Sequence, residues 1–202
     1  MNEDTNVSEK RDSRAQTKLL IGTSLIALFA AITAAGAFIA IPIGPVPIVL
    51  QNLFALLSGL VLGPLMGAAA TGLYLLAGIL GLPVFAGGAG GIARFAGPTG
   101  GFLVGYFLAA VTAGAIAGRP YNRVQNHKSS LLRIIAAVIA GLLIVYVPGV
   151  IWLKISRNLG WAKALLAGFV PFIIGDVFKG IAAVLIAPRL RRTAADFLNG
   201  EK

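Results

Sequence analysis

The sequence predicts an all-α integral membrane protein with six transmembrane helices and with both termini in the cytoplasm. Three observations favour this fold class: the 202 residues are 57% hydrophobic, only 12% are charged, and long apolar runs recur along the chain. A soluble domain usually carries about 25% charged residues. Because one crossing takes roughly 20 apolar residues, six helices would use about 120 residues and leave little for a soluble module.

The apolar runs place the six helices at 19–41, 52–62, 66–81, 101–118, 131–153 and 164–187. We expect one six-helix membrane domain at 19–188, since Pro188 should end the last helix. Residues 1–18 are polar and carry both charge signs, which predicts a disordered cytoplasmic tail. A cleaved signal peptide is the alternative, but the apolar run that follows is longer than a typical signal-peptide core. Residues 189–202 are expected to form a basic cytoplasmic C-terminal tail.

Two connections between these helices are unusual. Residues 42–51 (PIGPVPIVLQ) contain three prolines within six positions, which predicts irregular backbone because proline lacks an amide donor. Residues 82–106 hold seven glycines between Gly87 and Gly101, and one basic residue, Arg94. Non-helical backbone at membrane depth is tolerated only inside protein or beside a cavity. The glycine-rich loop is therefore predicted to cap a ligand site.

The basic residues predict the orientation in the membrane. With six crossings, twelve of the 17 lysines and arginines fall on one side, and Lys179 lies within the last helix. An excess of Lys and Arg marks the cytoplasmic side, so both termini are expected there and the two unusual connections on the outer face. The four basic residues expected outside are Arg94, Lys154, Arg157 and Lys163.

Six of the seven acidic residues lie near the ends of the chain, and the seventh, Asp176, lies within the last predicted helix. A carboxylate inside a span costs about 2.5–3.5 kcal/mol on insertion scales, so it is a functional-site hypothesis by default. Lys179 follows at i+3 on the same helical face. The alternatives are a self-neutralising pair that pins the helix to its neighbours, and a proton-transport role, which lacks a second buried acid or histidine. For Gln51, at the start of the second helix, we favour a ligand contact over a satisfied polar group.

Several function classes are excluded by what the sequence lacks. Paired carboxylates, zinc-protease motifs and Ser/His/Asp constellations are missing, so the chain is not expected to be an enzyme. The segment GGAGGIARFAGPTGG is not followed by Gly-Lys-Ser/Thr, so it is no phosphate-binding loop, and ATP hydrolysis would need another subunit. Without cysteine there are no thiolate metal sites, and we expect neither metal nor cofactor. The basic residues flank apolar helices, which indicates membrane lipids rather than nucleic acid as partners.

Small residues form two stripes on the first predicted helix. Ala27 with Ala31, and Ala30 with Ala34, are spaced four apart and let another helix approach closely. The spacing does not decide whether a stripe packs inside this protein or faces a partner.

Four segments in order, PIGPVPIVLQ, LGLPVFAGGAGG, GPTGGFLVGYFLAA and PFIIGDVFKGIAA, resemble the signature segments of the BioY family of biotin-binding S components of energy-coupling factor (ECF) transporters. The similarity covers most of 19–188. GPTGG with a following aromatic residue, and GDxxK in the last helix, are its most specific pieces. The family's usual GPTGGY and PVPITLQ read GPTGGF and PVPIVLQ here.

The resemblance implies a multi-pass protein of the bacterial cytoplasmic membrane that captures biotin from outside with high affinity. Its implied partners are a transmembrane coupling protein and two ATPase subunits, and the alanine stripes resemble the docking surface for the coupling protein. The resemblance also implies roles at the site. Asp176 would accept from the ureido N–H groups of biotin, Gln51 or Tyr74 would meet other polar edges, and Arg94 would bind the carboxylate. Lys179 would also bind the biotin carboxylate, or it would neutralise Asp176. The glycine loop, with Gly97 in GPTGG, would close over the vitamin.

Three other hypotheses remain open at this point. The chain could be an S component for another small vitamin or a metal, a proton-coupled carrier or channel that acts alone, or a structural membrane subunit. Biotin binding, competition by other vitamins and uptake driven by a pH gradient separate them.

Overall fold

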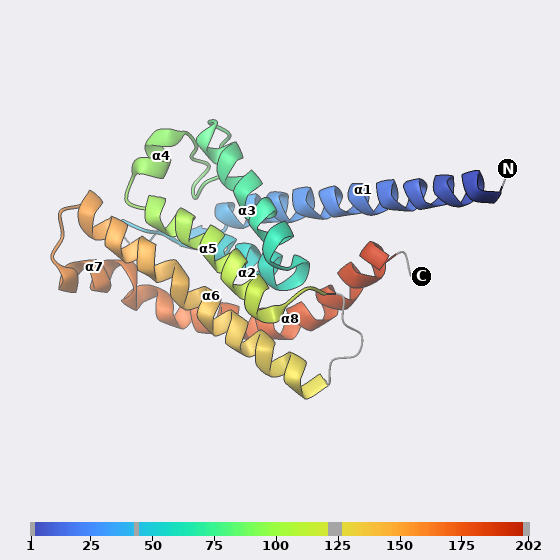
Figure 1. Ribbon diagram of the computed structural model, residues 1–202. Coiled ribbons are helices and arrows are strands. Elements are labelled where there is room, and N and C mark those ends of the chain that lie inside the picture. The colour runs from blue at the N-terminus through green and yellow to red at the C-terminus, as the bar shows by residue number, and fades with distance from the viewer. Residues whose placement is uncertain (1–2, 43–44, 121–126, 200–202) are drawn as a thin grey trace.

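The computed structural model describes residues 3–42, 45–120 and 127–199, with the backbone alone for 3–12, 14, 127–130 and 199. This part of the chain is helical apart from one small hairpin. The elements, shown in Figure 1, are α1 (Glu3–Phe38), β1 (Ala40–Ile41), β2 (Ile48–Val49), α2 (Gln51–Leu62), α3 (Pro64–Ile79), α4 (Ile92–Ala96), α5 (Gly100–Ala117), α6 (His127–Ser156), α7 (Trp161–Gly168), the 3-10 turn η1 (Val170–Phe172) and α8 (Ile173–Asn199).

The short helix α2 is the centre of the fold. All of its residues except Phe54 are buried, and it contacts α1, α3, α5, α6 and α8. Glycines make these approaches possible: a Cβ on Gly59 would lie 2.0 Å from the carbonyl oxygen of Ala110 on α5. A Cβ on Gly67 of α3 would lie 2.5 Å from the Cα of Gly59. Small residues at such points let helix backbones meet where lipid removes the hydrophobic drive for association.

The structure confirms an all-helical membrane protein. Four helical stretches of the described residues are long and apolar enough to cross a bilayer: Ala15–Phe38, Gly100–Ala117, Leu131–Ser156 and Trp161–Leu198. The helices α2 and α3 are apolar but shorter, with 12 and 16 residues. They are joined at Gly63, whose φ of 83° suits glycine, and Pro64 opens α3.

The first helix is longer than predicted. It begins at Glu3, so residues 3–18 are helical and not the disordered tail expected from their polarity. The physical reason is that no proline or glycine interrupts residues 3–21, and each residue added to an existing helix gains a backbone hydrogen bond. Figure 1 shows the first turns of α1 projecting beyond the bundle, toward the same end as the last turn of α8.

The last predicted helix differs at both ends. Instead of one helix at 164–187, the chain forms α7, breaks at 169–172 and restarts as α8. Pro171 explains the break, because it lacks an amide donor and suits the first turn of a new helix. The expectation that Pro188 ends the helix, with a separate tail at 189–202, is wrong: α8 runs on to Asn199.

The part of α8 beyond Pro188 is held by packing and by one arginine. Ala194, Ala195 and Leu198 are buried. The Arg191 guanidinium donates to the carbonyl of Leu60 near the end of α2. It also donates, at 3.0 Å each, to the carbonyls of Ala117 and Gly118 at the end of α5. A cation at the carbonyl ends of two helices is favourable because those ends carry partial negative charge.

The two unusual connections contain more regular structure than predicted. In the proline-rich segment β1 pairs with β2, Ala40 opposite Val49. The glycine-rich loop includes α4 and an isolated bridge between Phe85 and Ala89. Between the predicted fourth and fifth helices, at 119–130, residues 121–126 lie outside the described residues, and α6 begins at His127.

Candidate functional site

A buried cluster of polar side chains surrounds Asp176. Its Oδ1 atom accepts hydrogen bonds from Lys179 Nζ at 2.9 Å and from Asn52 Nδ2 at 3.1 Å. Its Oδ2 atom accepts a hydrogen bond from the Tyr146 hydroxyl. Asp176 and Lys179 are only 8% and 6% exposed. The carboxylate is therefore shielded and is held by groups from α2, α6 and α8.

The break before α8 explains how the carboxylate is tolerated in an apolar stretch. Because α8 restarts at Ile173, Asp176 lies in its first turn, where free amide groups and the helix dipole favour negative charge. The helix predicted at 164–187 is thus interrupted just before Asp176. Asn52 lies in the first turn of α2, so the amino-terminal ends of two helices meet at this carboxylate.

The start of α2 is held against the end of α1. The Leu50 amide donates to the Gly36 carbonyl at 3.2 Å. A Cβ on Gly36 would lie 2.6 Å from the Phe54 ring and 3.0 Å from the Gln51 amide nitrogen, so this contact requires glycine. This close contact between α1 and α2 directs the polar side chains of Gln51 and Asn52 into the protein, where the two residues are 2% and 7% exposed.

Two small cavities adjoin the polar cluster, each of about 20 Å³. Asn52, Tyr146, Phe172, Asp176 and Lys179 line the first, and Gln51, Phe85, Ala86, Thr99 and Leu103 line the second. The cavities share walls formed by Val46, Pro47, Val49, Phe102 and Tyr106. Each has room for about one water molecule. A larger ligand must therefore displace part of the shared wall.

Three buried polar atoms of the described residues have no hydrogen-bond partner: Gln51 Oε1, Asn52 Oδ1 and the Tyr74 hydroxyl. Buried side-chain polar atoms are normally hydrogen-bonded, so each such atom calls for an explanation. Gln51 and Asn52 line the cavities, where a ligand carrying N–H groups would satisfy their oxygens. Among the described residues no group of three or more His, Cys, Asp or Glu side chains comes together to hold a metal.

The structure brings Asp176, Lys179 and Gln51 to the cavities, whereas Tyr74, Arg94 and Gly97 do not line them. Tyr74 is buried edge-on against Phe85, with ring centroids 5.7 Å apart, and lines neither cavity.

Arg94 and Gly97 also lie outside the cavity walls, in the loop that covers the second cavity. Arg94 Nη2 contacts the Ala86 carbonyl at 3.4 Å. The Gly97 carbonyl accepts a hydrogen bond of 2.9 Å from the Trp152 indole.

Sequence reasoning missed Tyr106 and Tyr146 and favoured Gln51 over Asn52. Both tyrosines were visible as polar aromatic residues within apolar spans, as Tyr74 was. Their approach to Asp176 and Gln51 depends on how α5 and α6 pack, which spacing along one chain does not reveal.

The two alanine stripes of α1 face different ways. Ala27 and Ala31 are exposed, whereas Ala30 is buried and Ala34 is partly buried against the same cluster. The Ala30 stripe therefore packs inside the protein, whereas the Ala27 stripe lies on its surface.

A larger hollow, of about 430 Å³, lies between α6 and α8. Asp176 and Tyr146 reach one part of it, but the remaining lining side chains are apolar, among them Leu142, Phe169 and Ile181. Both flanking helices are candidate membrane spans, so this hollow has the character of a lipid-facing surface.

Comparison with known proteins agrees with this architecture. The model of the BioY family matches residues 8–196. The probable biotin transporter BioY of Pyrococcus horikoshii is 43% identical over 168 residues, which cover 83% of this chain and 94% of that protein. The biotin transporter BioY of Thermotoga maritima is 42% identical over 165 residues, covering 82% and 92%.

A solved structure shows the same fold. The crystal structure of the S component for biotin from an ECF-type ABC transporter superposes with a TM-score of 0.73 at 30% sequence identity, and the match covers 95% of each chain. With the family model spanning nearly the whole length, and relatives this similar, the chain belongs to the BioY family.

Proposed function

We propose that this protein captures biotin with high affinity and serves as the substrate-binding subunit of an ECF-type transporter. The observation that carries the proposal is the shielded Asp176 carboxylate beside a cavity, with unpartnered amide oxygens of Gln51 and Asn52 close by. The names of the relatives and of the matched structure, all of which refer to biotin, support the choice of ligand.

The site chemistry fits the two ends of biotin. The ureido ring offers N–H donors, for which Asp176 and the free oxygens of Gln51 and Asn52 are acceptors. The ring system is otherwise apolar and suits the wall around Phe102 and Val49. The other end is a carboxylate. Arg94 is the proposed partner for it. Among the described residues its guanidinium makes one long hydrogen bond, to the Ala86 carbonyl, and it can form a paired fork with a carboxylate instead.

Two more side chains complete the proposed site. Lys179 is assigned to holding Asp176 in place, because its ammonium already bonds that carboxylate at 2.9 Å. Tyr74, whose hydroxyl is unpartnered, packs edge-on against Phe85 and is proposed to reach the ligand when that ring moves. Gly97 contributes backbone to the covering loop.

Binding requires the site to open. Small-molecule sites usually enclose roughly 300–1,000 Å³, far more than the two cavities offer as they stand. The wall residues from the hairpin segment, Val46 and Pro47, and from the covering loop, Phe85 and Ala86, belong to the least regular parts of the molecule. These segments are the proposed moving parts.

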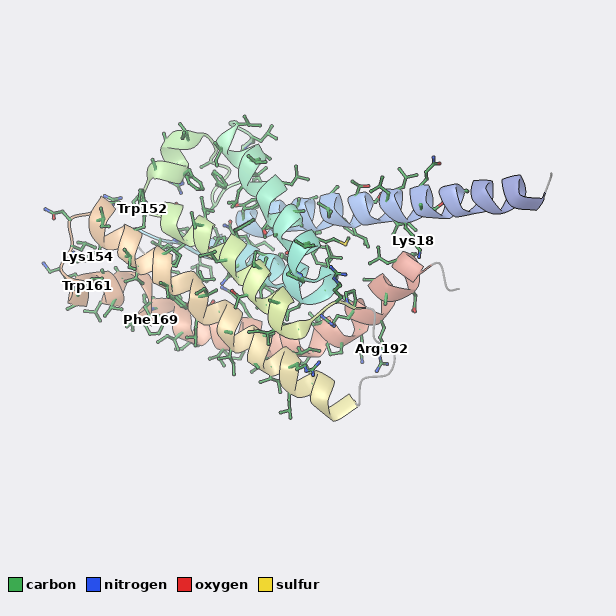
Figure 2. All side chains as sticks on the ribbon, in the orientation of Figure 1. Lys18, Trp152, Lys154, Trp161, Phe169 and Arg192 are labelled. Atoms are coloured by element: carbon green, nitrogen blue, oxygen red, sulfur yellow. The ribbon has the colours of Figure 1, made fainter. Side chains whose placement is uncertain are left out.

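We further propose six crossings with both termini in the cytoplasm, α2 and α3 being two short spans. Figure 2 supports this orientation, because Trp152, Lys154 and Trp161 gather at one end of the molecule and Lys18 and Arg192 at the other. Tryptophans prefer the membrane–water interface, and basic residues prefer the cytoplasmic side. The end with α4 and α7 is then the outer face.

The proposed partners are a transmembrane coupling protein, which docks on the exposed Ala27 and Ala31 stripe, and two ATPase subunits. The proposed location is the cytoplasmic membrane of a prokaryote, since the relatives come from bacteria and from an archaeon. In this scheme residues 19–188 and the rest of α8 form a single membrane domain.

The test is a titration of the purified protein in lipid nanodiscs with radiolabelled biotin, with unlabelled thiamine and riboflavin as competitors. Saturable binding that biotin alone displaces is the expected result. Displacement by thiamine or riboflavin would instead show that the protein binds another vitamin. Uptake into vesicles that contain only this protein, driven by a pH gradient, would favour a proton-coupled carrier instead.

A further inference from the structure

Trp152 forms a side-chain hydrogen bond that joins the covering loop, residues 82–99, to α6. It lies on α6, is 40% exposed, and donates from Nε1 to the Gly97 carbonyl at 2.9 Å. Among the described residues, no other side chain from outside residues 82–99 is hydrogen-bonded to this loop. Figure 2 shows Trp152 at the outer end of the bundle, beside Lys154 and Trp161.

Glycines at the start of α5 allow a close approach to α6 around Trp152. A Cβ on Gly101 would lie 2.4 Å from the Trp152 Cβ and 2.3 Å from the Pro148 carbonyl oxygen. A Cβ on Gly100 would lie 3.2 Å from Trp152 Nε1. These glycines bring the start of α5 against α6, so the indole reaches the loop directly. The GPTGG segment thus packs directly against this tryptophan.

The loop carries the walls of the second cavity. Phe85, Ala86 and Thr99 line it together with Gln51. The loop also contacts α3, since the Gly91 amide donates to the Gly78 carbonyl at 2.7 Å and a Cβ on Gly78 would collide with the Phe85 ring. Loop opening therefore begins on the α6 side, where one side-chain hydrogen bond holds Gly97. That movement breaks the Trp152 hydrogen bond, whereas the Gly97 carbonyl keeps its bond from the Gly100 amide at 3.0 Å.

We propose that Trp152 is a positioning residue that latches the covering loop and sets the rate of ligand exchange. This inference rests on the proposed biotin site. Because the latch is made by the loop and α6 alone, it stabilises the closed loop with or without ligand. Weakening it accelerates association and dissociation together and leaves the equilibrium affinity nearly unchanged.

The test compares wild type with Trp152→Phe and Trp161→Phe. Phenylalanine keeps an aromatic ring at position 152 but removes the N–H donor. Trp161 is the matched control, because it is the chain's other tryptophan, is exposed, and packs on Lys154 at 5.1 Å rather than on the loop. Biotin association and dissociation rates are measured in nanodiscs. For Trp152→Phe we expect both rates to rise about 2- to 10-fold, the range for one net hydrogen bond, with a dissociation constant within about twofold of wild type.

Three results would overturn the latch: unchanged rates in Trp152→Phe, a weaker affinity with unchanged association, or the same acceleration in Trp161→Phe. The second result would mean that Trp152 only supports the shape of the site. Failure of wild type to bind biotin would instead overturn the proposed function itself.

Discussion

Asn52 and Asp176, 124 positions apart in the chain, are joined by a hydrogen bond of 3.1 Å that closes α2 onto α8 at the cavity. The bond connects the first turn of the most buried helix to the carboxylate in the first turn of α8. Loss of the carboxylate should therefore affect ligand binding, and loss of its cation should affect the fold. These two effects can be measured separately.

Asp176→Asn is expected to weaken biotin binding roughly 100-fold, because a hydrogen bond to a charged group contributes about 1.5–3 kcal/mol. The measurement is an equilibrium titration in nanodiscs. Asp196→Asn, the same change near the other end of α8, is the control and should bind like wild type. Wild-type affinity in Asp176→Asn would remove the carboxylate from the proposed site.

Lys179→Met is expected to lower the stability of the protein strongly. It leaves a buried carboxylate without its cation, a change that costs about 3–5 kcal/mol in buried ion pairs. The double variant Asp176→Asn with Lys179→Met should recover most of the lost thermal stability in detergent. If Lys179→Met is as stable as wild type, the lysine does not serve to neutralise Asp176.

Gly59→Ala is expected to destabilise the bundle by about 1–3 kcal/mol, since its Cβ would overlap the Ala110 carbonyl and force helices apart. Thermal unfolding in detergent measures the loss. Gly160→Ala is the matched control, because no heavy atom lies within 4 Å of the added Cβ. Equal melting temperatures for the two variants would contradict the packing of α2 against α5.

Leucine substitutions on α1 should separate docking from folding. Ala27→Leu with Ala31→Leu changes exposed positions, so biotin binding should persist while co-purification with the coupling protein is lost. Ala30→Leu overfills a buried position and should instead cost about 1–3 kcal/mol of stability. Retained co-purification of the Ala27/Ala31 variant would show that this stripe is not the docking surface.

The sequence allowed prediction of the features that depend on local composition. Long apolar runs located the helices, and the isolated charge of Asp176 identified the centre of the candidate site. Its pairing with Lys179 at i+3 also followed from helix geometry, and the structure has that contact.

What could not be predicted depends on contacts between distant segments. The partners Asn52 and Tyr146 reach Asp176 only because α2, α6 and α8 converge. The helix continues past Pro188 because Arg191 and buried alanines hold it, and no pattern near the proline reveals those contacts. Pro171, in contrast, does break its helix. Whether a proline interrupts a membrane helix was decided by its neighbours in space.

The bonds of Arg191 have a mechanical consequence. One guanidinium joins the ends of α2 and α5 to α8, so these three helices are tied together at the end far from the cavities. The rim of the cavities consists of two-residue strands, glycine turns and a five-residue helix. The helices are thus cross-linked at one end of the molecule, and the short, irregular elements lie at the other. If a ligand displaces the rim, as proposed, we expect α2, α5 and α8 to keep their spacing at the Arg191 end and to move together.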